Sequence, residues 1–289
     1  MESHAATIKH FVKTPSGEIA YAERGSGPVA LFVHGVLVNS HIWRHQLETL
    51  SATHRCISID LLAHGDTKAA SGADFSSRSQ AIMLGEFLDA LGIDQVDLVG
   101  NDGGGAVCQL LAVARPGNVR SLVLTNCDAH DNWPPEAFKG FVDLCAAGNL
   151  AATLNAMLSD KSVYRSPGAL GPCYEDPSNV TDETIEIYLR PHLASEGRLA
   201  ELEKFVAAFD HRQTVAIETS LKKLRVPTLV VWGDDDVYFD EQWGRWLKDT
   251  IPGARRLIEL KGARLFFVEE RSSEFNEQVR LFWNELTAK

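Results

Sequence analysis

The pattern of hydrophobic and polar positions divides the chain into short apolar runs and longer segments with apolar residues at helical spacing. The short runs predict buried strands at residues 29–33, 56–60, 96–99, 119–124, 228–232 and 256–260. Helical spacing predicts helices at residues 41–50, 76–91, 106–115 and 273–287. The segment 7–23, with Pro15-Ser16-Gly17 as its turn, predicts a β-hairpin. Because strands and helices alternate, we expect an α/β fold with a doubly wound, mostly parallel sheet.

The middle of the chain departs from this alternation. After Trp133-Pro134-Pro135 the strand signals disappear, and they return only after Pro227. The stretch between is rich in helical pattern, with a proline- and glycine-rich interruption at residues 166–179. A chain of 289 residues suits one large domain with an insertion. We therefore predict an α/β core formed by residues 1–134 and 223–289, and an inserted helical cap at residues 135–222.

One strand ends in a motif that carries chemistry. The apolar run 96–99 leads into Gly100-Asn101-Asp102-Gly103-Gly104, and a helical pattern follows directly. This is the spacing of a nucleophile elbow, in which small residues permit a tight, strained turn between strand and helix. Asp102 occupies the nucleophile position. A carboxylate with an unperturbed pKa of about 3.9 is ionised at neutral pH and can attack without a base.

Two further polar segments follow predicted strands. His34-Gly35-Val36 comes after the run 29–33, and in enzymes with such a turn the backbone N–H groups of Val36 and Gly103 form an oxyanion hole. His34 itself is also compatible with a packed, hydrogen-bonded histidine. Trp232-Gly233-Asp234-Asp235-Asp236 follows the strand after the cap, where the carboxylate of a catalytic triad is expected, and we select Asp236. The alternative is a turn rich in aspartate.

With these motifs in this order, the chain resembles the α/β-hydrolase fold. Its aspartate elbow resembles the branch that contains haloalkane dehalogenases and epoxide hydrolases. The resemblance implies that Asp102 displaces a leaving group from carbon and forms an ester, which a histidine-activated water then hydrolyses. The family's C-terminal motif G-x-x-H-x-x-x-E-E matches residues 262–270 except that Leu265 stands at the histidine position. Leucine cannot act as a base, so the second step lacks its usual catalyst.

The resemblance also suggests residues that bind or activate a substrate. His130, near the start of the cap, is a candidate replacement base, and His34 and His130 are candidate substrate-binding residues. Opening an epoxide would use a cap tyrosine as the acid, for which Tyr164, Tyr174 and Tyr188 are available, and we select Tyr164 and Tyr188 as further substrate-binding residues. Gly103 stands where dehalogenases place a tryptophan, and Val36 where they often place an asparagine. Both departures disfavour halide release.

Composition and charge exclude several other classes. A net charge of −11 and the lack of a basic run argue against a nucleic-acid partner. No stretch approaches the roughly 20 apolar residues that span a membrane, and the chain start does not resemble a signal peptide. The five cysteines form no CxxC pair, which predicts buried free thiols and a cytoplasmic location. Neither metal-ligand spacing nor a nucleotide-binding motif is present, so we expect no metal and no cofactor.

Three functions stay open on the sequence. The first is an Asp-nucleophile hydrolase acting on a small or mid-sized apolar epoxide, ester or halide, with its deacylation base missing at Leu265 through a natural or an introduced change. The second is a lyase, isomerase or cyclase that uses Asp102 as an acid or base. The third is a binding protein that keeps the pocket without turnover. The expected partner is a small apolar molecule, and a homodimer is left open.

Overall fold

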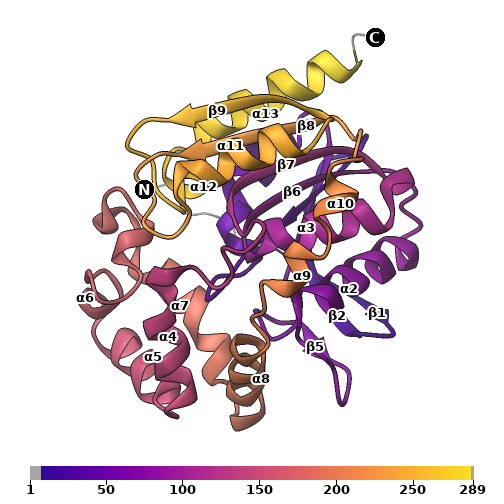
Figure 1. Cartoon of the computed structure of the whole chain (residues 1–289). Helices are drawn as coiled ribbons and strands as arrows, with labels where there is room; N and C mark the ends of the chain where they lie inside the picture. Colours follow the sequence, from indigo (N-terminus) through magenta and orange to yellow (C-terminus); the bar gives the residue numbers. More distant parts are fainter. Residues whose placement is uncertain (1–7, 288–289) are drawn as a thin grey trace.

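The computed structural model describes residues 8–287. Thr7, where we expected the hairpin to begin, and the chain start on which the expectation about a signal peptide partly depends lie outside the described residues. Within the described part, the predicted α/β fold is confirmed: strands and helices alternate around one large sheet (Figure 1).

The sheet has nine strands in the order β1-β2-β4-β3-β6-β7-β8-β9, and β5 pairs with β2. The strands from β3 onward in this order are parallel, as is the β4–β3 pair, whereas β2 is antiparallel to β1, β4 and β5. The strand bounds are β1 Lys9–Thr14, β2 Gly17–Arg24, β3 Val29–Val33, β4 Arg55–Ile59, β5 Lys68–Ala69, β6 Val96–Asp102, β7 Val119–Cys127, β8 Thr228–Gly233 and β9 Ala254–Leu260.

Thirteen α-helices accompany these strands within the described residues. They are α1 Arg44–Leu50, α2 Ser77–Ala90, α3 Gly103–Ala114, α4 Lys139–Ala146, α5 Leu150–Ser159, α6 Lys161–Tyr164, α7 Asp182–Leu189, α8 Glu196–Ala207, α9 Arg212–Val215, α10 Glu218–Leu221, α11 Glu241–Thr250, α12 Phe267–Glu270 and α13 Ser272–Thr287. Short 3-10 turns lie at Ser40–Trp43, Pro116–Asn118, Glu136–Phe138, Gly171–Cys173, Pro177–Asn179 and Arg190–Leu193.

Several strands and helices extend beyond their predicted bounds. We expected one strand at 96–99 and another at 119–124, but β6 continues to Asp102 and β7 to Cys127. Polar and glycine residues hide these ends in the sequence, and they become strand because they pair with each other, Gly100 opposite Leu124 and Asn101 opposite Thr125. Helix α3 likewise begins at Gly103, earlier than its apolar pattern suggested.

The parallel strands end at one edge of the sheet and deliver the chemical motifs there. Val33 pairs with Gly100, so the His34-Gly35-Val36 turn after β3 lies beside the Asp102 turn after β6. Leu124 pairs with Val230, which brings the segment after β7 next to the aspartate-rich turn after β8. Four loops from distant parts of the sequence therefore meet at this edge.

The chain between β7 and β8 forms helices only. In Figure 1 the helices α4 to α8 gather below the sheet, and α9 and α10 lead back beside α3. Hydrogen bonds attach this segment to the core: the amide of Asn39 donates to the carbonyl of Ile187 (2.8 Å), and Arg198 donates to the carbonyls of Gly65 (2.9 Å) and Thr67 (2.7 Å). The division into core and cap stays a prediction.

A buried polar cluster joins the same segment to the C-terminal part of the chain. Glu269 pairs with Arg44 at 2.6 Å, and its two oxygens accept hydrogen bonds from the hydroxyls of Tyr188 and Tyr174, both at 3.2 Å. The hydroxyl of Tyr164 lies 3.4 Å from that of Tyr174. Because Glu269 and the three tyrosines are buried, each charge and hydroxyl depends on the others for compensation.

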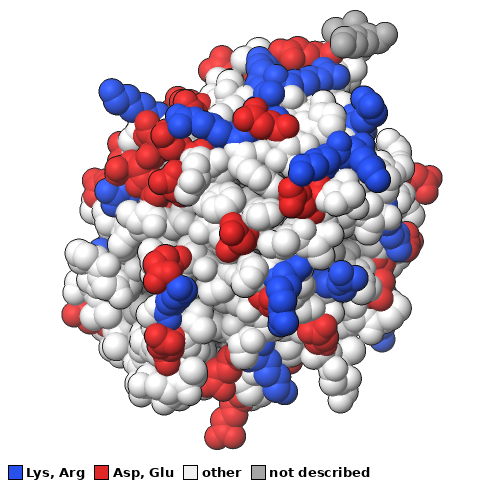
Figure 2. Space-filling view, in the orientation of Figure 1, with Lys and Arg blue, Asp and Glu red and all other residues white. Residues whose placement is uncertain are grey.

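Most charged side chains lie on the surface, although several carboxyl groups, Glu269 among them, are buried. Figure 2 shows acidic and basic groups interspersed over most of the visible face, with acidic groups gathered at its upper left.

All five cysteines are free and buried, as predicted. Within residues 8–287, no single helix is long and apolar enough to cross a membrane; the pair Glu136–Ala146 and Leu150–Ser159 passes that test together but is bent by 107°.

The Arg44–Glu269 pair predicts a stability difference. Substituting Glu269→Gln leaves the largely buried guanidinium without a countercharge, and we expect the free energy of unfolding to fall by about 3 kcal/mol. The matched control is Glu241→Gln, which breaks an exposed pair with Arg245 and should cost less than about 1 kcal/mol. Urea unfolding of the two variants measures both values. Equal losses would contradict a structural role for the buried pair.

Candidate active site

Asp102 occupies a strained turn between β6 and α3. Its backbone has φ 55° and ψ −136°, a conformation that a residue with a side chain seldom adopts. The turn projects the Asp102 side chain away from the strand at the edge of the sheet. Gly104 permits the turn, because a Cβ there would lie 2.3 Å from the carbonyl oxygen of Val33. The elbow predicted from the sequence therefore has the backbone geometry that this motif requires.

Two backbone N–H groups hold the Asp102 carboxyl. The N–H of Val36 donates to Oδ2 at 2.7 Å, and the N–H of Gly103 also donates to the carboxyl. Gly35 permits this approach, since a Cβ at that position would lie 2.0 Å from Asp102 Oδ2. The N–H groups predicted to form an oxyanion hole thus converge on Asp102 itself.

The Asp102 carboxyl faces a small, mostly apolar cavity. The residues lining it come from the loops after β3, β6, β7 and β8, from the helical segment and from the loop after β9: Val36, Asp102, Trp133, Pro135, Phe138, Leu170, Cys173, Tyr238, Phe239, Leu265 and Phe266. Asp102 is the one carboxylate among them. Such a lining favours a small apolar molecule, and it offers few polar groups that could solvate the Asp102 carboxylate.

Asp236 lies after β8 and is fixed by a residue of β7 and by the backbone of its own loop. Its Oδ2 accepts from the side-chain amide of Asn126 at 2.7 Å, and its Oδ1 accepts from the N–H of Tyr238 at 2.8 Å. Asn126 also exchanges hydrogen bonds with the backbone of Gly233, at 3.0 and 2.7 Å. Hydrogen bonds therefore hold both carboxyl oxygens of Asp236 in place.

Leu265, at the position where the resemblance places a histidine, lines the cavity with Asp102. It is 4% exposed, and its carbonyl accepts from the side-chain amide of Asn101 at 3.0 Å. Asn101 precedes the nucleophile position and so ties this loop to the elbow. The loop is in place, but its side chain offers no proton acceptor.

Burial changes the charge state of both carboxyls. It raises the pKa of Asp102 to about 7, against the effect of the Val36 and Gly103 N–H groups, and the nearby Asp236 raises it further. Burial also raises the pKa of Asp236 to about 7, although Tyr238, Asn126 and Phe239 donate hydrogen bonds to it. Burial therefore disfavours the state in which both carboxyls are ionised at neutral pH.

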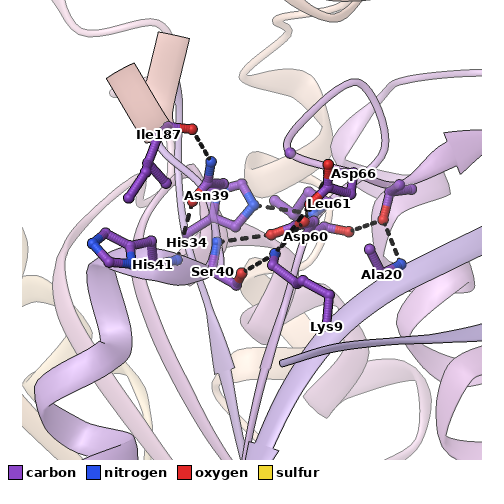
Figure 3. Close-up of polar contacts among 12 residues, drawn as sticks. Lys9, Ala20, His34, Asn39, Ser40, His41, Asp60, Leu61, Asp66 and Ile187 are labelled. Atoms are coloured by element: carbon purple, nitrogen blue, oxygen red, sulfur yellow. Dashed lines mark hydrogen bonds and ion pairs between the residues drawn. The ribbon is translucent and has the colours of Figure 1, made fainter. Parts of the chain in front are cut away.

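His34 lies beside Leu61 and the polar contacts of Asp60 (Figure 3). Its Nδ1 lies 2.7 Å from the carbonyl of Gly35, and its Nε2 accepts from the N–H of Leu61 at 3.0 Å. Burial lowers its pKa to about 4, so the ring is neutral. Asp60 braces the loop after β3: it accepts from the N–H of Ser40 (2.9 Å) and pairs with Lys9 (2.6 Å).

Four residues selected for substrate binding lie outside the cavity lining. His34 is enclosed as described, and Tyr164 and Tyr188 belong to the Glu269 cluster. His130 is partly exposed, with its ring nitrogens 3.2 Å from Asp131 and 3.3 Å from Glu218. The structure brings none of these four side chains to Asp102, because tertiary contacts that the sequence does not display turn them elsewhere.

The sequence analysis missed three polar groups near Asp102. Tyr238 lines the cavity from the loop after Asp236 rather than from the helical segment. Trp133, which served only as a boundary marker, lines the cavity too, and its indole N–H has no hydrogen-bond partner within residues 8–287. Asp128 follows β7 directly and is fully buried. Its place after a strand, like that of Asp102, was the available signal.

Residues 8–287 hold no cluster of histidine, cysteine or carboxylate side chains placed to bind a metal.

Comparisons with known proteins agree with this geometry. A family model for the alpha/beta hydrolase fold matches residues 28–271. Epoxide hydrolase 2 of Siraitia grosvenorii is 40% identical over 311 aligned residues, covering 94% of this chain and 97% of that protein. Haloalkane dehalogenase 2 of Mycobacterium tuberculosis (strain ATCC 25618 / H37Rv) is 29% identical over 258 residues, 88% of this chain and 87% of that protein. The solved structure of the epoxide hydrolase CorEH superposes with a TM-score of 0.79 at 19% identity, covering 96% and 99% of the two chains.

The close approach of Gly35 to Asp102 can be tested directly. A Gly35→Ala substitution puts a Cβ into the Asp102 carboxyl, and we expect about 1–3 kcal/mol of destabilisation. Gly168→Ala is the control, since nothing lies within 4 Å of the added atom there, and its effect should stay within about 0.5 kcal/mol. Urea unfolding measures both. If Gly35→Ala were as stable as the control, Asp102 would not sit against this turn.

Proposed function

Because the chain belongs to the alpha/beta hydrolase fold family, which makes it a hydrolase of that fold, we propose that it uses Asp102 as its nucleophile. The proposed substrate is a small apolar epoxide, ester or halide that binds under the helical segment 135–222 acting as the cap. In the proposed reaction Asp102 attacks carbon and forms an alkyl ester with the substrate. The observation that carries the proposal is the Asp102 carboxyl at the strained elbow, held by the Val36 N–H at 2.7 Å and facing the apolar cavity.

The contacts of Asp102 favour attack by one particular oxygen. Oδ2 is fixed by the Val36 N–H, which leaves Oδ1 to approach the substrate carbon. When water later attacks the ester carbonyl, Oδ2 becomes the oxyanion and already lies beside its donors. The same two N–H groups therefore orient the nucleophile in the first step and stabilise the intermediate in the second.

The cavity lining supports a small apolar substrate with a single polar leaving group. The buried indole N–H of Trp133 makes no hydrogen bond to another described residue, so it is free to donate to a leaving atom. The relatives are named for two kinds of substrate, haloalkanes and epoxides. The leaving atom is a halide in the first and an oxygen in the second. Val36 and Gly103 provide no side-chain donor to a halide, so a halide should leave more slowly than an activated oxygen, but Asp102 can still displace it.

The raised pKa of Asp102 also favours a second function. With its pKa raised to about 7 by burial, Asp102 is suited to take and return protons. A lyase, isomerase or cyclase would use it in this way, with no covalent ester and no need for a base at residue 265. The two functions differ in whether the substrate becomes bonded to Asp102.

An alkyl halide should therefore leave a covalent trace. We expect that incubation with butyl bromide adds one butyl group to the protein, because Asp102 displaces bromide and Leu265 cannot activate water to release the ester. Intact-mass spectrometry detects the adduct, and peptide mapping assigns it to Asp102. Asp102→Asn is the matched control and should stay unmodified. An unmodified wild-type protein that converts another substrate would favour the lyase or isomerase function, and no chemistry at all would favour a binding protein.

Restoring the family's base should release that ester. In Leu265→His, the imidazole enters the cavity lining beside Asp102, and Asp236 is in place to orient it. We expect butanol to be formed over repeated turnovers, at least about 100 times faster than in the wild-type protein. Leu265→Met, which keeps the bulk without a base, is the control. Release at the same rate from both variants would show that residue 265 does not occupy the base position.

Ester formation should depend on pH. Burial raises the pKa of Asp102 to about 7, and only the ionised carboxylate attacks, so the rate of alkylation should rise with pH. We expect an increase of about tenfold from pH ~6 to pH ~8, followed by a plateau. Time-resolved intact-mass measurements with butyl bromide give the rate at each pH. A rate that is flat across this range would place the pKa of Asp102 near its ordinary value.

A further inference from the structure

Asp128, directly after β7, is a buried carboxyl stabilised by its own backbone N–H but by no other described residue. It is 0% exposed, and neither of its carboxyl oxygens hydrogen-bonds to another residue of the described range 8–287. The backbone around it is fixed, because its carbonyl accepts from the side-chain amide of Gln109 at 2.8 Å. Since an unpaired buried carboxyl costs stability, its presence here calls for a role in the chemistry.

The Asp128 side chain lies beside the elbow. A Cβ built on Gly103 would have as its nearest neighbours a ring carbon of Trp133 at 3.7 Å, Asp128 Oδ2 at 3.8 Å and a methyl of Val36 at 3.9 Å. Trp133 and Val36 both line the cavity. Asp128 does not itself line the cavity, but its carboxyl and two residues of the lining border the same space at Gly103.

The surroundings of Asp128 favour its protonated form. Burial raises the pKa of Asp128 well above its usual range, and the charge of Asp102 raises it further. Two neighbouring carboxyls in a low-dielectric site share one negative charge more readily than they hold two. With Asp102 ionised, Asp128 is the neutral carboxylic acid.

We propose that Asp128 is the proton-transfer group of this site, donating to an oxygen leaving group and then serving as the base that Leu265 does not provide. The proposal rests on the proposed function, since it requires the ester on Asp102. It also narrows the substrate to a compound whose leaving atom is oxygen, such as an epoxide.

The first step balances with one proton from Asp128. Oδ1 of Asp102 forms a bond to an epoxide carbon, and the carbon–oxygen bond breaks with its electron pair going to oxygen. The resulting alkoxide takes the proton of Asp128 and becomes a hydroxyl. Asp102 is now a neutral ester and Asp128 a carboxylate, so the single negative charge has moved from one carboxyl to the other.

The second step returns the proton. The Asp128 carboxylate removes a proton from water, and the hydroxide attacks the Asp102 ester carbonyl, whose oxygen lies at the Val36 and Gly103 N–H groups. The intermediate then expels the alkoxide of the diol and leaves Asp102 as a carboxylic acid, whose proton the alkoxide takes. Asp102 is again a carboxylate and Asp128 again an acid.

A halide substrate stops this cycle after its first step. Bromide departs with its electron pair and needs no proton, so Asp128 stays protonated and cannot activate water. The ester on Asp102 therefore persists. The same protein should turn over an epoxide but be trapped by an alkyl halide of the same chain length.

The competing acid is Tyr238, whose hydroxyl lies in the cavity lining beside the Cys173 thiol. The experiment compares butylene oxide with butyl bromide in the wild-type protein, Asp128→Asn and Tyr238→Phe. Diol formation measures complete cycles, and intact mass measures the ester on Asp102. Asparagine has the shape of the neutral acid, and ester formation from butyl bromide shows that the variant is folded with a working Asp102.

We expect the wild-type protein to convert butylene oxide to the diol and to be trapped by butyl bromide. Asp128→Asn should form the butyl ester within about threefold of the wild-type rate but lose about 100-fold or more in diol formation. Gly103→Ala, which fills the space beside Asp128 while keeping the N–H group, should also reduce diol formation more than ester formation.

Opposite outcomes separate the two proposals. Unchanged diol formation by Asp128→Asn, loss of it in Tyr238→Phe alone, or trapping of the wild-type protein by butylene oxide would overturn the role of Asp128 while leaving Asp102 as nucleophile. If butyl bromide forms no ester on the wild-type protein, or if Asp102→Asn still makes the diol, the proposed function itself fails, and the role of Asp128 with it.

Discussion

The hydrogen bond from the Val36 N–H to Asp102 Oδ2, at 2.7 Å, is the contact on which the arrangement of the site depends. It requires two turns from different strands to meet within contact distance. Pairing of β3 with β6 sets their register, a glycine at residue 35 leaves room for the carboxyl, and the positive φ of Asp102 turns its side chain toward the donor. A change in any of these moves the carboxyl away from a hydrogen-bond donor that stabilises its charge in an apolar cavity.

The electrostatic consequence is a site with more carboxyls than it can ionise. Asp102 and Asp236 both have their pKa raised to about 7 by burial, and that of Asp128 is raised well above its usual range. In family members with a histidine at the position of Leu265, an imidazole would accept the proton during turnover. In this chain the cavity wall is leucine there, and we propose that the carboxyls themselves transfer the proton. The fold tolerates this because Asn126 and the backbone stabilise Asp236 by hydrogen bonds.

The sequence predicted the parts of the site that depend on local motifs. The elbow at Asp102, the turn at Val36 and the α/β alternation follow from spacing and hydrophobic pattern, and the structure contains them. The ends of β6 and β7 could not be predicted from the hydrophobic pattern, because residues such as Gly100, Asn101 and Thr125 become strand only through pairing between the two strands. The positions of Tyr164, Tyr188 and His130 depend on tertiary contacts that the hydrophobic pattern does not reveal. Asp128 was missed for a related reason: whether a carboxyl after a strand is solvated or buried without a partner is decided by packing alone.

The central claim is that the Asp102 carboxyl becomes bonded to the substrate while its second oxygen stays at the backbone donors. The most direct measurement is a crystal structure of the protein after exposure to butyl bromide. We predict continuous density from Asp102 Oδ1 to the alkyl chain inside the cavity, with Oδ2 within hydrogen-bond distance of the N–H groups of Val36 and Gly103. An unmodified Asp102, or an alkyl group bonded to another side chain such as Cys173, would contradict the account.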